Sequence, residues 1–238
     1  MKKAIIIGGT SGIGRGLAEL LIEHDWTVAI TGRRIELLNE IKENAKNNIL
    51  IQKHDITEIN NSDEKMESLF SKLKVVDLVI VSSGVSELNQ ELNWEIENKL
   101  IETNVNGIAK VYEFIFSKFK KQGHGHLVGI SSIASLRGNR HAPSYSASKA
   151  FQANYLEALR CIAKNEKLAI TITDVQPGFI DTPMAKGEGL FWVASVKKAS
   201  HQIYSAILKK KRKVYITKRW RVIAWGMKIA PSWVLEKI

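Results

Sequence analysis

The chain has 238 residues, of which 45% are hydrophobic and 25% charged, and its formal net charge is +11. This length suits one α/β domain with helices on both faces of a sheet and leaves little room for a second domain. The single cysteine, Cys161, excludes an internal disulfide and a cysteine-based metal site. We therefore expect a reducing compartment, no metal, and a buried apolar role for Cys161.

The excess positive charge is concentrated at the C-terminal end. Residues 1–196 carry 23 basic and 23 acidic side chains, whereas residues 197–238 carry 12 basic side chains and one acid, Glu236. A basic tail on a neutral body indicates an anionic partner, although a solvated basic face explains the charge equally well. A membrane surface is the stronger of the two anionic partners, because no recognised nucleic-acid-binding module accompanies the charge.

The first nine residues have two lysines before a short apolar run, as a signal peptide does. The apolar length and the cleavage site of a signal peptide are missing, and glycines follow at once. No run approaches the ~18 apolar residues of a membrane-spanning helix. We therefore expect a first strand here and a cytoplasmic protein, peripheral to a membrane if the tail binds one.

Apolar runs rich in β-branched residues alternate with segments of helical length. The runs occupy residues 4–8, 27–31, 49–52, 77–82, 126–131 and 169–175. This alternation predicts βαβ units and a doubly wound parallel sheet of the Rossmann type. Ligands of such sheets bind beyond the carboxyl ends of the strands, so the candidate site residues should follow directly after each run.

The first run leads into the glycine-rich turn GGTSGIG, which opens an amphipathic helix. Glycines let the backbone turn tightly and approach a pyrophosphate, and the helix N-terminus offers free N–H groups. Between a strand and a helix, this turn predicts a dinucleotide site, with a purely structural turn as the alternative. The expected cofactor contacts in the turn are Gly8, Thr10, Ser11, Gly12, Ile13 and Gly14.

Polar residues follow the next two runs. Arg33 and Arg34 stand where an NAD-binding protein usually places an acid, and their planar donors suit a 2′-phosphate. NADP(H) is therefore favoured over NAD(H), although two exposed arginines could merely start a helix. After the third run, Asp55 and Ile56 are expected beside the adenine, where Asp55 either accepts from the amino group or caps the next helix.

Tyr145 and Lys149 lie four residues apart in a segment of small residues, so they share one face of a predicted helix. Such a pair alone is usually a solvated surface pair. Other features at strand ends are the serines after the fifth run, Ser131 and Ser132, and the backbone break at Pro177-Gly178 after the sixth. Each of these is weak evidence in isolation.

Together, the glycine turn, Asn104 in TNVNG, Ser132, Tyr145-x-x-x-Lys149 and Pro177-Gly178 resemble the short-chain dehydrogenase/reductase family in order and spacing. Ser132 precedes Tyr145 by 13 residues, as the active-site serine of that family does. The resemblance covers residues 3–185. It implies an NAD(P)-dependent oxidoreductase acting on a carbonyl/alcohol pair, and a homo-oligomer, either a dimer or a tetramer.

The resemblance also implies a role for each matched residue. Tyr145 exchanges a proton with the substrate oxygen as hydride moves, while Lys149 lowers the pKa of Tyr145 and holds the nicotinamide ribose. Ser132 polarises the same oxygen, and Asn104 holds a water that links Lys149 to solvent or only bends its helix. Further cofactor contacts implied by the resemblance are Ser83, Gly84, Pro177, Gly178, Ile180 and Thr182.

Two positions depart from the pattern of the family. Ile7 stands where a threonine usually precedes the glycine turn, and Val81-Ser82-Ser83-Gly84 replaces the usual Asn-Asn-Ala-Gly. In the family these two positions support each other across neighbouring strands. We therefore expect one coordinated replacement of a polar contact by an apolar one.

Beyond residue 185 the resemblance fades. We expect a core over 1–185, a substrate lid and helix over 186–213, and a last strand and basic tail over 214–238, all in one domain. In the lid, Phe191 and Trp192 either line an apolar substrate pocket or pack on the body. The strand is predicted at Val214–Thr217 and the tail helix at Lys218–Ala230. This helix should have one apolar stripe of Trp220, Ile223, Ala224 and Met227, and a second apolar side of Val222, Trp225 and Ile229.

The tail helix has three alternative partners: an anionic membrane surface, a second subunit, or the core of its own chain. The main functional hypothesis is an NADP(H)-dependent oxidoreductase for a moderately apolar carbonyl or alcohol. A non-catalytic NADP-binding sensor and a membrane-associated scaffold are alternatives on the same fold. The intact set of Ser132, Tyr145, Lys149 and Asn104 argues against the sensor.

Overall fold

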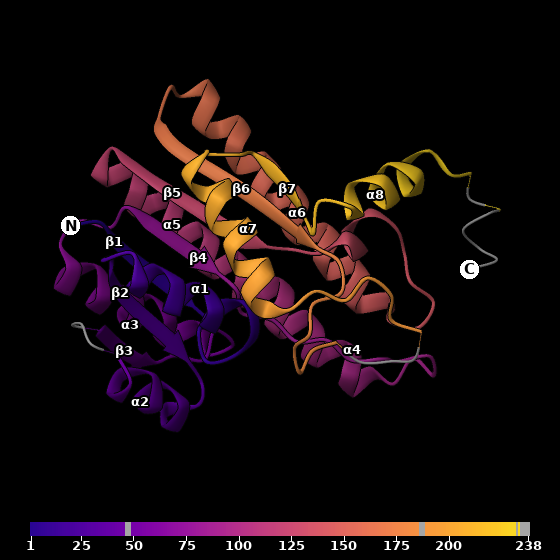
Figure 1. The fold of residues 1–238 in the computed structure, drawn as a ribbon, viewed down its shortest axis with the longest axis horizontal. Coiled ribbons are helices and arrows are strands. Elements are labelled where there is room, and N and C mark those ends of the chain that lie inside the picture. The colour runs from indigo at the N-terminus through magenta and orange to yellow at the C-terminus, as the bar shows by residue number, and fades with distance from the viewer. Residues whose placement is uncertain (46–48, 186–188, 232, 234–238) are drawn as a thin grey trace.

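The computed structural model of the chain describes residues 1–45, 49–185, 189–231 and 233. Within these residues one seven-stranded parallel sheet has the strand order β3-β2-β1-β4-β5-β6-β7 (Figure 1). The strands are β1 (Lys3–Ile7), β2 (Thr27–Gly32), β3 (Ile49–Lys53), β4 (Leu78–Val81), β5 (His124–Ile130), β6 (Ala169–Pro177) and β7 (Lys213–Ile216).

Helices cover both faces of this sheet. The α-helices are α1 (Gly12–Glu23), α2 (Ile35–Glu43), α3 (Ile59–Leu73), α4 (Trp94–Ile101), α5 (Ile108–Gln122), α6 (Pro143–Asn165), α7 (Val196–Leu208) and α8 (Trp220–Ile229). A π-helical turn, η1 (Glu102–Gly107), joins α4 to α5, and a 3₁₀ turn, η2 (Ile133–Leu136), follows β5. The doubly wound α/β fold that the sequence predicts is therefore confirmed.

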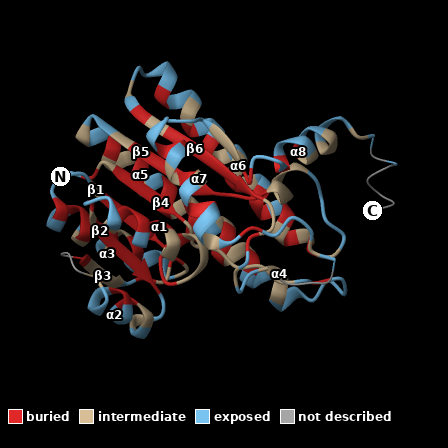
Figure 2. Ribbon diagram, viewed as in Figure 1, coloured by how far each residue is buried: buried red, intermediate tan, exposed pale blue. Residues whose placement is uncertain are grey.

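The alternation of side chains along the strands divides the core into two layers. On β1, Ala4 and Ile6 pack with α1, α2 and α7, whereas Ile5 and Ile7 pack with α3, α5 and α6 on the opposite face. The runs are continuously apolar because both faces are covered. Figure 2 shows the resulting layer of buried strands between helices whose outer sides are exposed.

The departures at Ile7 and Val81 meet in the sheet. These two residues are partners in the parallel register of β1 and β4, and each is 1% exposed. Both belong to the apolar layer formed with α3, α5 and α6. The expected replacement of a polar contact by an apolar one is therefore confirmed, and it lies just before the glycine turn.

The sequence predicts the elements of the tail and the burial of Cys161 less accurately than the rest of the fold. Strand β7 begins one residue before the predicted strand, and α8 covers the central part of the predicted tail helix. Cys161 is exposed on α6, so its expected burial is wrong: the apolar character of a cysteine does not determine which side of a helix it occupies. Residues 186–188 of the predicted lid, and 232 and 234–238 of the tail, lie outside the described residues.

No helix within the described ranges is long and apolar enough to cross a membrane.

Candidate active site

A cleft of about 1680 Å³ runs along the edge of the sheet where the strands end. This volume exceeds the ~300–1,000 Å³ of a pocket for one drug-sized ligand, so the cleft has room for a dinucleotide together with a substrate. All the candidate catalytic and cofactor-binding residues that the sequence predicts line this cleft, except Gly14 and Asn104. The cleft lies over β1 and its two neighbours, β2 and β4, where the strand order reverses and open α/β sheets bind their ligands.

The glycine turn forms a backbone cradle between β1 and α1. Gly8 has a φ of +88°, and a Cβ built on it would lie 2.6 Å from the Ser83 nitrogen. A Cβ on Gly14 would lie 2.1 Å from the Gly8 carbonyl oxygen, so Gly14 serves close packing and does not itself line the cleft. Gly12, with a φ of +54°, begins α1, whose free N–H groups open toward the cleft. A cradle of this kind, which side chains would fill, fits a pyrophosphate.

The two arginines after β2 have different surroundings. The Arg34 guanidinium donates to Thr10 Oγ1 at 3.0 Å and to Ser11 Oγ at 2.9 Å, and so holds the glycine turn. The Arg33 side chain is 57% exposed, and its nearest carboxylate oxygen, on Asp55, is 4.0 Å away. Arg33 therefore keeps its donors available at the rim of the cleft, while those of Arg34 are partly used.

Asp55 holds the turn after β3. Its Oδ1 accepts from the backbone N–H of Thr57 at 3.0 Å and from the Thr57 hydroxyl at 2.8 Å. Helix α3 begins only at Ile59, with Glu58 in the N-cap position, so the alternative that Asp55 caps this helix is wrong. Asp55 and its neighbour Ile56 both line the cleft.

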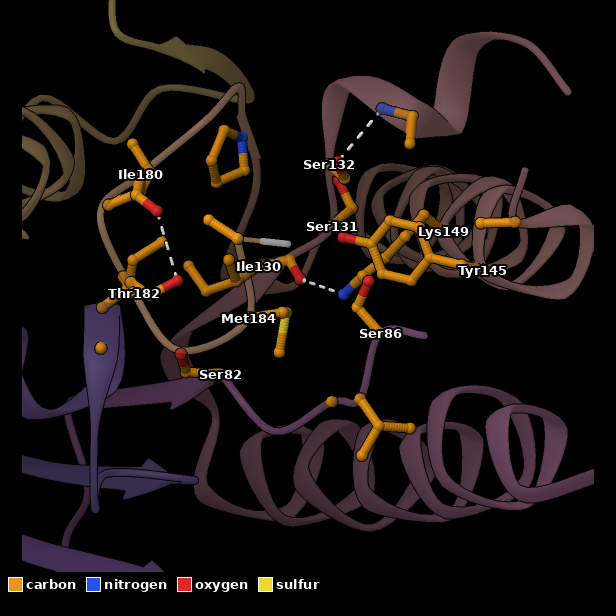
Figure 3. Close-up of a pocket in the computed structure, with 18 of the residues that line it drawn as sticks. Ser82, Ser86, Ile130, Ser131, Ser132, Tyr145, Lys149, Ile180, Thr182 and Met184 are labelled. Carbon is orange, nitrogen blue, oxygen red and sulfur yellow. Dashed lines mark hydrogen bonds between the residues drawn. The ribbon is translucent and has the colours of Figure 1, made fainter. Parts of the chain in front are cut away.

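Ser132, Tyr145 and Lys149 come together where β5 ends and α6 begins (Figure 3). Ser132 follows β5, and its hydroxyl accepts from the Ala134 N–H at 3.1 Å while it also hydrogen-bonds with Tyr145. The Lys149 ammonium donates to the Ile130 carbonyl at 3.0 Å and lies 5.9 Å from the centre of the Tyr145 ring. The end of β5 and one face of α6 thus bring together the hydroxyl groups of Ser132 and Tyr145 and the ammonium group of Lys149.

Burial decides the protonation of this group. The pKa of Tyr145 is raised by burial, and the hydrogen bond with Ser132 opposes the rise only in part. The net shift of this pKa is therefore upward, whereas the resemblance implies a lowered value. Burial also lowers the pKa of Lys149 to about 8, against the opposing field of Asp174. At neutral pH Tyr145 holds its proton.

Gln152 connects Lys149 to Asn104. The Lys149 ammonium donates to Gln152 Oε1 at 3.0 Å, and Gln152 Nε2 donates to the Asn104 carbonyl oxygen at 2.8 Å. The Asn104 side chain exchanges hydrogen bonds with the backbone of Val85, at 2.9 and 2.8 Å. A side-chain amide thus connects Lys149 to the main chain of Asn104. Asn104 lies in the π-helical turn η1, as its alternative role at a bend requires.

A buried carboxylate lies on β6, next to the end of β5. Asp174 is fully buried and accepts from the Ser131 hydroxyl and, at 2.7 Å, from Gln176 Nε2. Lys213 on β7 lies 3.9 Å from it. Burial raises the pKa of Asp174, whereas these three partners lower it. The carboxylate of Asp174 in turn favours the protonated form of Lys149.

The other end of the cleft is apolar. Phe179, Phe191 and Trp220 line it and form an aromatic cluster, with Trp220 at 5.3 Å from Phe179 and 5.1 Å from Phe191 between ring centres. Trp192 does not line the cleft but packs on Trp220 at 6.0 Å. Phe191 therefore lines the cleft, whereas Trp192 packs on the body.

The loop after β6 spans the cofactor end and the apolar end of the cleft. Thr182 Cγ2 would lie 3.1 Å from a Cβ on Gly12, so this loop returns over the glycine turn. Ile180 is buried and pairs with Ala194 in an isolated β-bridge. A Cβ on Gly178 would lie 2.0 Å from Trp220 Cε2, so the glycine after Pro177 makes room for this indole.

The sequence reasoning missed three residues of this site: Gln152, Asp174 and Trp220 in its contact with Gly178. Gln152 lies one helical turn after Lys149 on the same face, and this spacing could have drawn attention to it. Asp174 is the one charged residue of β6, and a charge within a buried strand indicates a partner. No local signal relates Trp220 to Gly178.

Comparison with known proteins places these residues in context. The family model described as short chain dehydrogenase matches residues 2–190. An uncharacterized oxidoreductase of Myxococcus xanthus is 31% identical over 188 residues, which are 77% of this chain and 74% of that protein. The 3-oxoacyl-(acyl-carrier-protein) reductase FabG of Chlamydia muridarum is 28% identical over 192 residues, 78% of this chain and 77% of the relative.

A solved structure shows the same fold. The short chain dehydrogenase from Burkholderia cenocepacia, determined in complex with NADP, superposes with a TM-score of 0.84 and 23% identity, covering 100% of this chain and 98% of that one. Family model, relatives and fold agree over the segment that carries the glycine turn and the Ser132, Tyr145 and Lys149 group. The chain belongs to the short-chain dehydrogenase family of oxidoreductases.

Proposed function

We propose that this protein is an NADPH-dependent reductase that converts a carbonyl group on a moderately apolar substrate to an alcohol, with Tyr145 as the proton donor. The observation that carries the proposal is the meeting of Tyr145, Ser132 and Lys149 in a cleft that continues to the glycine turn. Bound NADPH would supply the hydride, and the chain supplies the proton and the orientation.

The residues of the cleft divide the task of holding the cofactor. The glycine turn and the N-terminus of α1 are suited to the pyrophosphate, and Arg33 to the 2′-phosphate. Asp55 and Ile56 would flank the adenine, and Lys149 would hold the nicotinamide ribose. The proposed contacts beside the nicotinamide are Ser83, Gly84, Pro177, Gly178, Ile180 and Thr182, all of which line the cleft.

In the reductive direction Tyr145 is the proton donor. It carries a proton at neutral pH, where a tyrosine of ordinary pKa is also protonated, and burial raises its pKa further. Ser132, hydrogen-bonded to Tyr145, would donate to the same oxygen and orient it. The Lys149 ammonium, connected through Gln152 to Asn104, would stabilise the negative charge that develops on Tyr145.

The substrate class is supported by the lining of the far end of the cleft. Phe191, Trp220, Ile223 and Met227 offer apolar surface in the cleft, and Ser132 and Tyr145 offer hydroxyl groups to a polar end of the substrate. The name of the Chlamydia relative places a ketone on an acyl chain, which has the same division into a polar end and an apolar body. A homo-oligomer, as the family resemblance implies, is part of this proposal.

The test is a fluorescence titration with NADPH and NADH, followed by an absorbance screen of aldehydes and ketones with wild type and Tyr145→Phe. We expect selective NADPH binding by both proteins and turnover by wild type alone. Binding without turnover across a broad panel would instead favour an NADP-binding sensor. Light scattering of the same samples measures the oligomeric state.

A further inference from the structure

Helix α8 has apolar side chains on two opposite sides. Because successive residues of an α-helix turn by about 100°, one side comprises Trp220, Ile223, Ala224 and Met227, the inner face, and the opposite side comprises Val222, Trp225 and Ile229, the outer face. Trp220 and Ala224 are buried, and Ile223 and Met227 line the cleft. The outer face is 60–68% exposed. The chain thus covers the inner face and leaves the outer face exposed.

The inner face cannot be exchanged for the outer one without loss of contacts. Arg137 donates to the Lys228 carbonyl at 3.0 Å near the end of α8, and Arg219 donates to the Trp192 carbonyl at 2.9 Å just before its start. Trp220 is fixed between these points by the aromatic cluster and by its approach to Gly178. The outer face is therefore left exposed on α8, which lies at the end of the molecule near the C-terminus (Figure 1).

The charged residues on α8 and directly before it are all positive. Lys218, Arg219, Arg221 and Lys228 are exposed, and residues 189–235 contain no acid at all. Within the described part of the chain, none of these four side chains takes part in a salt bridge; Arg219 stacks on Trp192. Arg221 and Lys228 project between the inner and outer faces, along one edge of the outer face. Their positive charges are free to pair with anions outside the chain.

We propose that the outer face of α8 docks on an anionic lipid bilayer, with the helix lying in the plane of the interface. Tryptophan beside exposed lysine and arginine suits the boundary between headgroups and acyl chains, whereas lysine is depleted where proteins bury one another. The ten residues of α8 span only about 15 Å, so the contact is peripheral.

This contact would bring the cleft close to the lipid. Ile223 and Met227 lie on the side of α8 that lines the cleft, so the bilayer would lie about one helix diameter, ~10 Å, from it. The docking surface goes beyond the proposed reductase and does not depend on it.

The experiment is a flotation assay of the full chain with vesicles of phosphatidylcholine alone or of equal parts phosphatidylcholine and phosphatidylglycerol. We expect wild type to float with the anionic vesicles only, and added salt to weaken the binding. Val222→Ser/Trp225→Ser/Ile229→Ser should lower the bound fraction at least tenfold. Trp94→Ser is the matched control, because Trp94 on α4 is 69% exposed and lies outside the cleft; it should bind as wild type does.

A second variant, Arg221→Glu/Lys228→Glu, changes the charge and leaves every apolar contact in place. This variant should also fail to bind the anionic vesicles. Wild type that stays unbound, or binding that survives both variants, would overturn the proposal. If wild type does not bind vesicles, and light scattering shows a dimeric wild type but a monomeric outer-face variant, the outer face binds a second copy of the chain. Reduction of a water-soluble carbonyl compound is measured without vesicles, and both variants should retain this activity. This measurement distinguishes failure of the docking proposal from failure of the proposed function.

Discussion

The Lys149 ammonium and the Gln152 side-chain amide are joined by a 3.0 Å hydrogen bond, and Gln152 continues the connection to the Asn104 carbonyl at 2.8 Å. Lys149 is 4% exposed and its second acceptor is the Ile130 carbonyl, so two neutral oxygens stabilise its charge. Gln152 is consequently a positioning residue for the proposed proton donor.

Two substitutions of Gln152 should shift the inflection in the pH profile of kcat, which reports the pKa of Lys149, in opposite directions. Gln152→Leu removes an acceptor, so it should lower the pKa of Lys149 below about 8 and reduce kcat by roughly tenfold. Gln152→Glu places a carboxylate beside the ammonium and should raise that pKa. The measurement is kcat for carbonyl reduction between pH 6 and 10. A purely structural role for Gln152 would lower kcat for both variants and leave the inflection in place.

Asp174 on β6 should affect the same inflection of the kcat profile, because it too changes the pKa of Lys149. Its field raises the pKa of Lys149, so Asp174→Asn should shift the inflection of the kcat profile below about 8. The rate at pH 6 should change less, because Lys149 is protonated there in both proteins. An identical inflection in Asp174→Asn and wild type would contradict the electrostatic role.

Arg33 and Arg34 should differ in their effect on cofactor choice. Arg33→Ser removes an exposed donor suited to the 2′-phosphate, so KM for NADPH should rise roughly tenfold or more while KM for NADH stays near its wild-type value. Arg34→Ser releases Thr10 and Ser11, so it should raise KM for both cofactors. Steady-state kinetics with each cofactor tests this. An equal effect of Arg33→Ser on NADPH and NADH would reject the 2′-phosphate assignment.

Gly178 should be required because of Trp220. A Cβ at position 178 would lie 2.0 Å from Trp220 Cε2, so Gly178→Ala should displace the indole and lower the free energy of unfolding by about 1–3 kcal/mol. Calorimetry measures the change. Gly138→Ala, at a glycine with nothing within 4 Å of its Cβ, is the control and should change stability by less than about 0.5 kcal/mol.

A double variant distinguishes this contact from a general backbone effect. In Gly178→Ala/Trp220→Ala the new methyl group has no indole to meet, so the two costs should not add. Additive costs would show that Gly178 serves another purpose than room for Trp220.

The sequence by itself determined the sheet and the cofactor end of the cleft. Strands fill with β-branched residues on both faces when helices cover both, so their apolar runs are visible without any long-range information. The glycine turn is equally local, because Gly8 and Gly12 have positive φ values and Gly14 has no space for a Cβ. The departures at Ile7 and Val81 also paired as expected, since parallel register follows from neighbouring strands.

Only the tertiary structure decided the electrostatics of the site and the use of the tail. The raised pKa of Tyr145 and the lowered pKa of Lys149 arise from burial, which depends on how α6 packs against the end of β5. The Gln152–Asn104 contact spans 48 residues, and Trp220 meets Gly178 only because α8 folds back over the cleft. Two apolar sides of the tail helix could be read from its sequence. Which side the body buries, and which it leaves to a partner, depends on contacts between distant segments that no local pattern encodes.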